Sequence, residues 1–481
     1  MANSIHLPDS FLNCIKETLP AGLDLNDFIA ICQQPLRKSI RVNTLKISVT
    51  DFLDRIAHLQ WQLTPIPWCS EGFWLTREDE SIPLGNTAEH LAGLFYIQEA
   101  SSMMPVTALF HLWQSQTDDT IVLDAAAAPG SKTTQIAAQL NNQGLLIANE
   151  FSSSRVKVLH ANLVRCSATN VALTHFDARV FGTWLTESVD AVLLDAPCSG
   201  EGAIRKDEFA MKNWTIESVH EIAQCQKELI ESAFYALKPD GVLIYSTCTL
   251  NRHENQGVCE HILATFGDAV EPLPLTDLFD HAQAVATPEG YLHVWPQVYD
   301  SEGFFVAGFR KKQSVVPTEQ QRHRGKFPFS PASAKQKEAL FNYLNQQFGI
   351  TSEQLPGDIF SRDAEVWLFP CAFAQVQGKV KFDRVGIKLA DVIKKTYRVS
   401  HELALSIGAL ATKNVYELTS EQAREYYMGR DIHLDQVNAT NKGELILLYK
   451  GAAIGLGKWV GARIKNSYPR DLVRDNHLFI E

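Results

Sequence analysis

Between residues 120 and 250 the chain alternates short apolar runs with segments of helical periodicity, and this alternation restricts the fold more than any other feature. Five runs are strand-like: 120–124, 145–149, 170–173, 190–195 and 241–246. Three segments between them have apolar residues at helical spacing: 132–140, 153–165 and 218–237. Such alternation produces βαβ units and a parallel sheet, whose ligands bind beyond the carboxyl ends of the strands. We therefore expect an α/β fold with a site at that edge.

A chain of 481 residues is too long for one hydrophobic core, so we expect several domains. Residues 1–115 are of mixed α/β type, and 116–312 contain the alternating segment. The stretch from 311 to 331 is polar and contains proline, which predicts a boundary or an exposed loop. Beyond it we expect a small α/β domain at 330–384 and a β-rich barrel at 385–481, where short strands and glycine turns dominate.

The composition, 45% hydrophobic and 21% charged residues, is ordinary for a globular protein. No apolar run approaches the roughly 18 residues of a membrane span, and residues 1–12 lack the features of a signal peptide. Nine cysteines without a secretory signal indicate reduced thiols, and none has metal-site spacing. We therefore expect a cytoplasmic protein that neither associates with a membrane nor binds a metal ion.

The net charge of −11 argues weakly against a nucleic-acid partner, but phosphates are bound by local basic clusters rather than by the total charge. Three clusters are present: Arg37, Lys38, Arg41 and Lys46; Lys311, Lys312, Arg322, Arg324 and Lys326; and Lys450, Lys458, Arg463, Lys465, Arg470 and Arg474. One such cluster is usually a solvated surface. Three of them on an acidic chain favour an RNA partner.

The loop after the first predicted strand contains small residues rather than several glycines. A dinucleotide needs backbone close to its pyrophosphate and therefore several glycines, which makes NAD the weaker alternative. S-adenosylmethionine has no phosphate, and small side chains are enough to let it pass. We expect the cofactor to contact Ala126, Ala127, Ala128, Pro129, Gly130, Ser131 and Lys132. Lys132 would lie at the methionine end or in the catalytic crevice, although a lysine at a helix start is nearly as common without such a role.

Acidic residues follow the next three predicted strands. Glu150 ends the second strand, where a carboxylate can accept from both ribose hydroxyls. Asp177 follows the third strand and can accept from the adenine amino group, and Asp195 ends the fourth. A single acid in such a place is usually an ordinary turn residue. An acid at each successive strand end favours a cofactor site.

Two cysteines follow the fourth and fifth predicted strands, Cys198 in a Pro-Cys motif and Cys248 in a Thr-Cys motif, and we expect both in one crevice. Carbon 5 of cytosine attacks a methyl sulfonium only after a nucleophile adds to carbon 6, and a cysteine thiolate suits that step. A carboxyl such as Asp195 can assist by hydrogen bonding to N3. Spacing does not decide which cysteine attacks. The others are expected to be small buried apolar residues: Cys14, Cys32, Cys69, Cys166, Cys225, Cys259 and Cys371.

These motifs together resemble the NOL1/NOP2/Sun (RsmB/NOP) family of RNA cytosine-C5 methyltransferases. The matching positions are 98–102, 124–133, Glu150, Asp177, 195–200 and 246–250, and the likeness spans roughly residues 30–312. The resemblance implies a Rossmann-like, S-adenosylmethionine-dependent methyltransferase sheet. It also implies that Cys248 is the nucleophile and that Cys198 assists product release. DNA cytosine methyltransferases attack from a Pro-Cys site, so the presence of both motifs implies RNA.

The C-terminal residues 458–470 resemble the PUA-like domain of the bacterial small-subunit rRNA member of this family. That likeness implies RNA-binding domains at 1–115 and 385–481, and 5-methylcytosine formation in 16S rRNA, at cytosine 1407, on a base flipped out of its helix. Arg205 and Lys206, just past the Pro-Cys motif, are expected to hold phosphates near that base. Two alternatives remain: the same chemistry on tRNA, and a non-catalytic RNA-binding or ribosome-assembly factor. The intact Asp195, Cys198 and Cys248 argue against the second.

Overall fold

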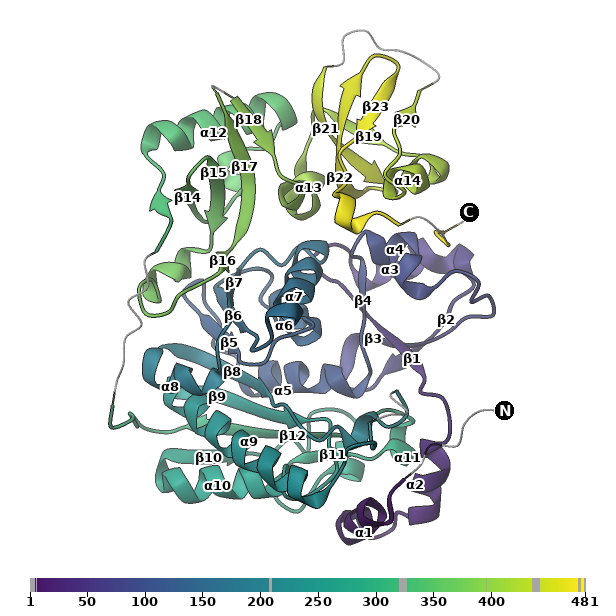
Figure 1. Ribbon diagram of the computed structural model, residues 1–481, viewed down its shortest axis with the longest axis vertical. Helices are drawn as coiled ribbons and strands as arrows, with labels where there is room; N and C mark the ends of the chain where they lie inside the picture. The colour runs from purple at the N-terminus through teal and green to yellow at the C-terminus, as the bar shows by residue number, and fades with distance from the viewer. Residues whose placement is uncertain are drawn as a thin grey trace.

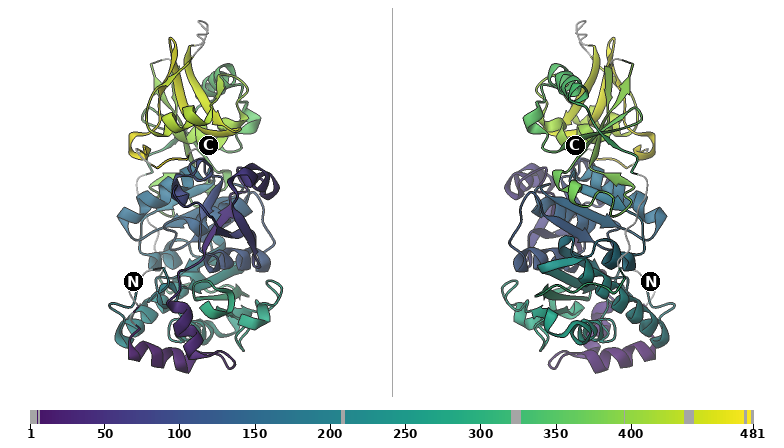
Figure 2. Two further views of the ribbon diagram at one scale, coloured as in Figure 1. Left: turned by 90° about the vertical axis from the view of Figure 1, so that its right-hand side faces the viewer. Right: turned by 90° about the vertical axis from the view of Figure 1, so that its left-hand side faces the viewer.

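The computed structural model describes residue 5 and residues 7–206, 210–319, 327–394, 396–434, 442–474 and 477–479. Its strands form four sheets in an elongated molecule (Figure 1, Figure 2). Two five-stranded sheets, built from residues after 327, form one end of the molecule, and the nine-stranded sheet and the N-terminal segments form the rest. None of the helices in these described ranges is long and apolar enough to cross a membrane.

The nine-stranded sheet has the order β10-β12-β9-β8-β5-β6-β7-β16, and β11 pairs with β12. Its strands are β5 (Ile121–Asp124), β6 (Leu145–Asn149), β7 (Val171–Thr174), β8 (Val189–Asp195), β9 (Leu237–Thr247), β10 (Val270–Leu273), β11 (Leu292–Val294), β12 (Phe304–Lys311) and β16 (Arg384–Val385). Strands β7, β6, β5, β8 and β9 are parallel neighbours, which confirms the predicted βαβ core. Strand β9 begins at Leu237 rather than at residue 241, because Leu237 already pairs with Val189 ahead of a bulge.

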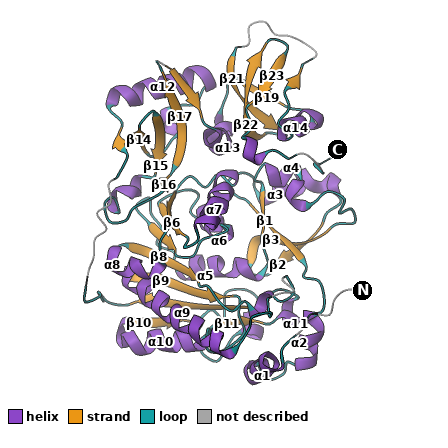
Figure 3. Cartoon of the chain, viewed as in Figure 1, coloured by secondary structure: helices purple, strands orange, loops and turns teal. Residues whose placement is uncertain are grey.

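Helices cover both faces of this sheet (Figure 3). The helices of the unit are α5 (Met104–Leu112), α6 (Ser131–Gln139), α7 (Ser153–Arg165), α8 (Phe181–Trp184), α9 (Ile216–Ala236), α10 (Gln256–Phe266) and α11 (Pro296–Tyr299). Alternate residues of β5 point to opposite faces. Ile121 and Leu123 pack with α8, α9 and α10, whereas Val122 packs with α5, α6 and α7. A strand buried on both faces explains why β5 is apolar without alternation.

The N-terminal segment divides between two places. Its elements are α1 (Asp9–Thr18), α2 (Leu25–Cys32), β1 (Lys38–Val42), α3 (Val49–Ile56), β2 (Gln62–Ile66), β3 (Cys69–Thr76), α4 (Ala88–Leu91) and β4 (Phe95–Ile97). The strands form an antiparallel sheet of order β2-β3-β1-β4. Helices α1 and α2 instead pack Phe11 and Phe28 against Trp214 and Trp295 of the central unit. The domain boundary at 115 stays a prediction, with α1 and α2 seated on the neighbouring unit.

The chain beyond residue 327 forms two further β-sheets. The first has the order β13-β14-β15-β17-β18 and the second β19-β21-β22-β23-β20. The elements are β13 (Ser330–Pro331), α12 (Ala334–Phe348), β14 (Asp358–Arg362), β15 (Glu365–Phe369), β17 (Ile387–Ile393), β18 (Thr396–Val399), α13 (His401–Ile407), β19 (Val415–Glu417), α14 (Ser420–Tyr427), β20 (Ile432–His433), β21 (Gly443–Tyr449), β22 (Ala452–Val460) and β23 (Arg463–Asn466). The predicted domain boundary at 385 therefore falls inside the first sheet, because β15 pairs with β17.

The C-terminal end is joined to the rest of the molecule by a shared core. Phe52 and Phe95 of the N-terminal segment belong to the same buried cluster as Tyr427 and Tyr449. Strand β16 adds a further link, because it pairs with β7 at the edge of the central sheet. The guanidinium of Arg55 donates to the carbonyls of residues 449 and 450. These contacts hold the C-terminal sheets against the N-terminal segment.

Candidate active site

The two cysteine motifs lie side by side because β8 and β9 are parallel neighbours. Asp195, the last residue of β8, pairs with Ser246 near the end of β9. The loops that follow therefore leave the sheet at the same edge. The Sγ atoms of Cys198 and Cys248 are 3.2 Å apart, and both side chains are partly buried.

Two buried carboxylates join these loops. Glu201, in the Cys198 loop, accepts hydrogen bonds at 2.9 Å from the backbone amides of Leu250 and Asn251 beyond Cys248. Glu254 accepts at 2.9 Å from the backbone amide of Ser199, next to Cys198. The amide of residue 202 also donates to the carbonyl of residue 248, at 2.9 Å. Each loop is thus fixed by groups of the other, which sets the distance between the two sulfurs.

The hydrogen bond to Cys248 and, to a smaller extent, burial raise the pKa of the Cys198 thiol well above its ordinary value. Cys198 is therefore a thiol, not a thiolate, at neutral pH. A thiol donor at 3.2 Å from Cys248 can stabilise a thiolate there or return a proton to it.

Asp195 is held by two donors. Lys132 Nζ lies 2.6 Å from Asp195 Oδ2, and Ser246 Oγ donates to Asp195 Oδ1 at 2.7 Å. Lys132 also donates to Ser102 Oγ at 2.9 Å. Burial lowers the pKa of Lys132, but the carboxylates of Asp195 and Asp124 outweigh it, and the pKa ends above its usual value. The structure places Lys132 in one cavity with both the small-residue loop and Cys248, so its role at the methionine end or in a catalytic crevice stays a prediction.

The cofactor loop opens into a cavity of about 330 Å³ that also reaches Cys248. Among the predicted site residues, the lining includes Ala126, Ala127, Ala128, Pro129, Ser131, Lys132, Asp195 and Cys248. Gly130 has a φ of 106°, and a Cβ there would lie 3.0 Å from Leu159 Cδ1, so the turn into α6 requires glycine. The lining does not include Gly130, Cys198, Glu150 or Asp177.

Glu150 and Asp177 follow β6 and β7 as the sequence predicts. Glu150 is 4% exposed, and its Oε1 accepts from the backbone amide of Ser152 at 2.8 Å. Its Oε2 lies 3.4 Å from Arg155, a residue that lines the cavity. Asp177 accepts four hydrogen bonds from the guanidinium and the backbone of Arg179, which lower the pKa of its carboxyl. Arg179 therefore already occupies part of the acceptor capacity of Asp177.

Further cavity residues went unrecognised in the sequence, among them Arg155, Glu302 and Phe304. Glu302 and Phe304 lie at the start of β12, which runs antiparallel to β9. The first residues of an antiparallel strand reach the edge where parallel strands end. A search for polar residues only at strand ends therefore overlooks them.

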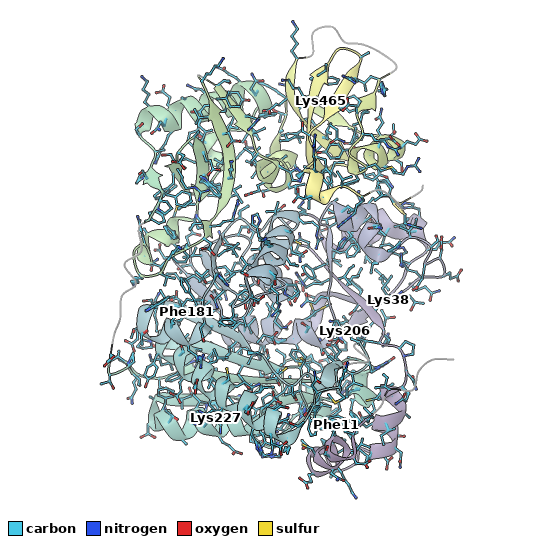
Figure 4. The ribbon with its side chains drawn as sticks, viewed as in Figure 1. Phe11, Lys38, Phe181, Lys206, Lys227 and Lys465 are labelled. Carbon is cyan, nitrogen blue, oxygen red and sulfur yellow. The ribbon has the colours of Figure 1, made fainter. Side chains whose placement is uncertain are left out.

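A larger cavity of about 510 Å³ lies between α1, α9 and α10 and contains none of the predicted site residues. Lys227 at its margin lies apart from Lys206 (Figure 4).

The expectation that Arg205 holds an RNA phosphate is wrong. Its side chain is 1% exposed and donates to Asp300 Oδ1 at 2.6 Å and to the carbonyl of Pro35 at 2.8 Å. An arginine that is buried with protein acceptors has no free donor for RNA. Lys206 has a side chain that is 65% exposed and lines the active-site cavity, so it alone of the pair can reach a substrate.

Within the first two basic clusters, Arg41 and Lys311 are buried and Lys46 is partly buried, whereas Lys38 and Lys312 are exposed. Arg41 is 2% exposed and donates to Gln98 at 2.9 Å, and Lys46 donates to a backbone carbonyl at 2.9 Å. Lys311 is buried and pairs with Glu187 at 2.9 Å. The remaining members of that second cluster beyond Lys312 lie outside the described residues: Arg322, Arg324 and Lys326.

The expected burial of the seven other cysteines is also wrong in part, because Cys371 is exposed.

The C-terminal cluster does form an exposed face. Lys458 of β22 lies directly opposite Lys465 of β23, and Arg463 occupies the same face two residues away. All three side chains are exposed, as is that of Arg470. Arg463 pairs with Asp431 at 3.1 Å. Lys465 lies at the far end of the molecule from Lys206 (Figure 4). Among the described residues no group of histidine, cysteine and carboxylate side chains could hold a metal ion.

Comparison with known proteins places this site in a family. Residues 111–310 match the model of the 16S rRNA methyltransferase RsmB/F family, and residues 7–100 that of the RsmF N-terminal domain. The pre-PUA and PUA domains of RsmF match residues 329–407 and 413–474. The ribosomal RNA small subunit methyltransferase F of Aeromonas salmonicida is 60% identical over 480 residues, covering all of both chains. The chain belongs to the RsmF family. A member from Vibrio atlanticus is 56% identical, also over the full length of both.

Solved structures agree with this placement. A methyltransferase homologue from Pyrococcus horikoshii is 34% identical, covers 63% of this chain and 100% of its own, and superposes with a TM-score of 0.52. NSun6 from Pyrococcus horikoshii is 23% identical and shares the fold, with a TM-score of 0.55 over 64% of this chain and 98% of its own. The RsmF family assignment confirms the predicted Rossmann-like methyltransferase sheet followed by a PUA-like β-rich end.

Proposed function

We propose that this chain transfers a methyl group from S-adenosylmethionine to carbon 5 of a cytosine, cytosine 1407, in the 16S rRNA of the small ribosomal subunit. One observation carries the proposal: two cysteine sulfurs lie 3.2 Å apart beside a cavity that Cys248 shares with the cofactor loop. A paired thiolate and thiol suit addition to a pyrimidine and its reversal. The full-length identity to rRNA methyltransferases supports the substrate class. An enzyme with that substrate would act in the cytoplasm.

The residues of the cavity fit S-adenosylmethionine, which supplies an electrophilic methyl group when bound. The small side chains of Ala126, Ala127 and Ala128 leave the cavity open along the loop. Glu150, 4% exposed at the end of β6, would bind the ribose hydroxyls, and Asp177 the adenine amino group. Lys132 would do more than contact the cofactor. It would also orient Asp195 through their 2.6 Å ion pair.

Cys248 would form the covalent bond to carbon 6 of the flipped base. The addition makes carbon 5 an enamine carbon, which takes the methyl group. A base then removes the carbon 5 proton and the sulfur of Cys248 leaves. Cys198, whose raised pKa keeps it protonated, would donate its proton to the departing sulfur. Asp195, ion-paired with Lys132, would contact the polar edge of the base.

Replacement of the nucleophile tests this function. Cys248→Ala should abolish methyl transfer and covalent trapping by 5-fluorocytosine RNA while cofactor affinity is retained, because only the covalent step is removed. Cys371→Ala, which removes an exposed thiol elsewhere, is the matched control and should behave as wild type. Turnover or trapping by Cys248→Ala would refute the assignment.

Bisulfite sequencing of 16S rRNA and tRNA from cells with and without the gene tests the substrate. Loss of methylation at cytosine 1407 alone is the expected result. Loss of methylation in tRNA instead would show that tRNA is the substrate. Unchanged methylation in both would favour a non-catalytic role in ribosome assembly.

A further inference from the structure

Glu302 lies in the active-site cavity but has no part in the reaction described above. It lies two residues before β12, whose Phe305 pairs with Thr247 at the end of β9. The amide of residue 303 donates to the carbonyl of residue 202 at 3.1 Å, next to the Cys198 loop. Glu302 and Cys248 line the same cavity of about 330 Å³. Glu302 therefore belongs to the cavity that a base attached to Cys248 would enter.

One carboxyl oxygen of Glu302 is buried without a hydrogen-bond partner among the described residues, and it forms an ion pair with Lys206. The residue is 4% exposed, and its Oε1 forms no hydrogen bond within the described part of the chain. Lys206 Nζ is 3.7 Å from that oxygen, too far for a hydrogen bond. Buried polar atoms are almost always paired in native proteins. An unpaired carboxyl oxygen on a residue that lines a cavity indicates a group that can acquire its partner from a ligand.

The surroundings of Glu302 favour its neutral form. Burial, and then the neighbouring carboxyl of Glu99, raise the pKa of Glu302 to about 8, against the opposing effects of Lys206 and Lys132. The carboxyl of Glu99 accepts from the amide of Glu302 at 3.0 Å and from that of Ser102 at 3.1 Å, as well as from the hydroxyl of Ser101. It is therefore filled as an acceptor and offers Glu302 no proton.

Asp195 differs from Glu302 in its partners. Its two oxygens accept from Lys132 at 2.6 Å and from Ser246 at 2.7 Å. A carboxylate paired with a lysine accepts hydrogen bonds and has no proton to give. The cavity thus contains one carboxyl suited to accept and one suited to donate. Environments that separate the protonation states of two carboxyls commonly mark acid and base roles.

We propose that Glu302 binds the flipped cytosine and lends a proton to N3 while Cys248 adds to carbon 6, and that Asp195 accepts from the 4-amino group. This inference rests on the proposed cytosine-C5 methylation. A neutral carboxyl has one donor and one acceptor oxygen. Its O–H matches N3, which is an acceptor in cytosine and a donor in uracil. Glu302 would therefore contribute both to catalysis and to the choice of base.

The proton and the electrons balance over the cycle. As the Cys248 sulfur forms its bond to carbon 6, the electron pair of the 5,6 double bond moves between carbons 4 and 5. N3 then receives the electron pair of its double bond to carbon 4 and takes the proton of Glu302. After carbon 5 has taken the methyl group and lost its hydrogen to a base, the sulfur leaves. N3 then returns its proton to the Glu302 carboxylate, and the base is neutral 5-methylcytosine.

The test compares Glu302→Gln with wild type in single-turnover methylation of a 16S rRNA transcript across pH 6 to 10. Glutamine has nearly the shape of glutamate but no acidic proton. At neutral pH the rate should fall at least tenfold, with the cofactor affinity unchanged. The wild-type rate should fall as pH rises through about 8, where Glu302 loses its proton, and this falling limb should be absent in Glu302→Gln. Glu221→Gln, an exposed carboxylate on α9, is the control and should keep both the rate and the limb.

Two further variants separate a proton donor from a structural group. Glu99→Gln removes the like charge beside Glu302 and should move the falling limb to lower pH. Glu302→Asp keeps an acid and should keep a falling limb at a reduced rate. An unchanged rate and limb in Glu302→Gln, or a missing limb in Glu302→Asp, would overturn the inference. Wild type that neither methylates the transcript nor is trapped by 5-fluorocytosine RNA would instead refute the proposed function itself.

Discussion

At the scale of single residues, the environment of the Cys198 thiol is set by burial and by the sulfur of Cys248, which lies only 3.2 Å away. The pKa of Cys198 is raised by its hydrogen bond to Cys248 and by burial, so Cys198 keeps its proton. In the proposed mechanism, a protonated neighbour is what the departing sulfur of Cys248 needs. The same environment makes Cys198 a poor nucleophile, because only the thiolate attacks.

We predict that Cys198→Ala accumulates a covalent protein–RNA adduct. Without the proton donor, Cys248 adds to the base but leaves slowly. The adduct should survive a denaturing gel after incubation with unmodified 16S rRNA and S-adenosylmethionine. It should be absent from the Cys198→Ala/Cys248→Ala double variant, because the attacking sulfur is then missing. A single variant without an adduct, or a double variant with one, would contradict this division of roles.

We predict that Glu150→Ala and Asp177→Ala weaken cofactor binding, Glu150→Ala more strongly. Loss of one partner for a buried polar group costs about 1–3 kcal/mol, which is roughly tenfold or more in affinity. Asp177 should contribute less, because Arg179 already occupies part of its acceptor capacity. Titration calorimetry with S-adenosylmethionine measures the effect, and Asp268→Ala, at an exposed position of a short 3-10 helix, is the control. Unchanged affinity in both variants would remove the two residues from the cofactor site.

At the scale of elements, the parallel pairing of β8 and β9 brings the two cysteine loops to one edge of the sheet, and hydrogen bonds between the loops set their spacing. Glu201 provides much of this connection, since both of its oxygens are occupied by groups of the Cys248 loop and by Trp214. Strand β12 adds Glu302 from the opposite direction. The site is thus built from the ends of two strands and the start of a third.

We predict that Glu201→Gln slows trapping by 5-fluorocytosine RNA and lowers the free energy of unfolding by about 1–3 kcal/mol. The amide NH₂ of glutamine would face backbone N–H groups that now donate to a carboxylate, so one buried donor would lose its acceptor. Urea unfolding and trapping kinetics measure the two effects, with Glu221→Gln as the control. Cofactor affinity should not change, because Glu201 does not line that cavity. Wild-type trapping kinetics in Glu201→Gln would show that the loops keep their spacing without it.

At the scale of the whole molecule, the C-terminal end is fixed to the N-terminal segment through one aromatic cluster rather than by a linker alone. Arg55 reinforces the contact by donating to the carbonyls of residues 449 and 450. The exposed basic face of β22 and β23 therefore keeps a set position relative to the active site. An RNA that binds both would have to reach from the end of the molecule that holds Lys465 to the region of Lys206 (Figure 4).

We predict that the basic face binds RNA backbone without reading its sequence. Each phosphate neutralised by a lysine releases counterions, so binding must weaken steeply with salt. Lys458→Gln/Lys465→Gln should weaken rRNA binding and flatten the slope of log affinity against log salt by about two units. Filter binding over a salt series measures the slope. Lys16→Gln/Lys335→Gln, at exposed positions on α1 and α12, is the control. An unaltered slope in the β22–β23 variant would mean that this face is merely solvated.

The sequence alone determined the parallel core, the small-residue cofactor loop and the order of the acids and cysteines, because βαβ units are local and their strands end at one edge. It also placed Asp195, Cys198 and Cys248 at neighbouring strand ends, where the structure has them. Periodicity and turn chemistry act over a few residues, and this is the range in which such inference is reliable.

Only the tertiary structure decided which polar groups face a ligand. Arg205 and Arg41 look like RNA-binding cations in the sequence, yet both are buried with protein acceptors. Glu302 looks like an ordinary loop acid, yet antiparallel pairing of β12 brings it into the cavity. Burial and strand direction depend on partners far away in the chain. The sequence of a charged residue is the same whether its side chain contacts water, protein or substrate. That is the physical reason why the cysteines were predictable and Glu302 was not.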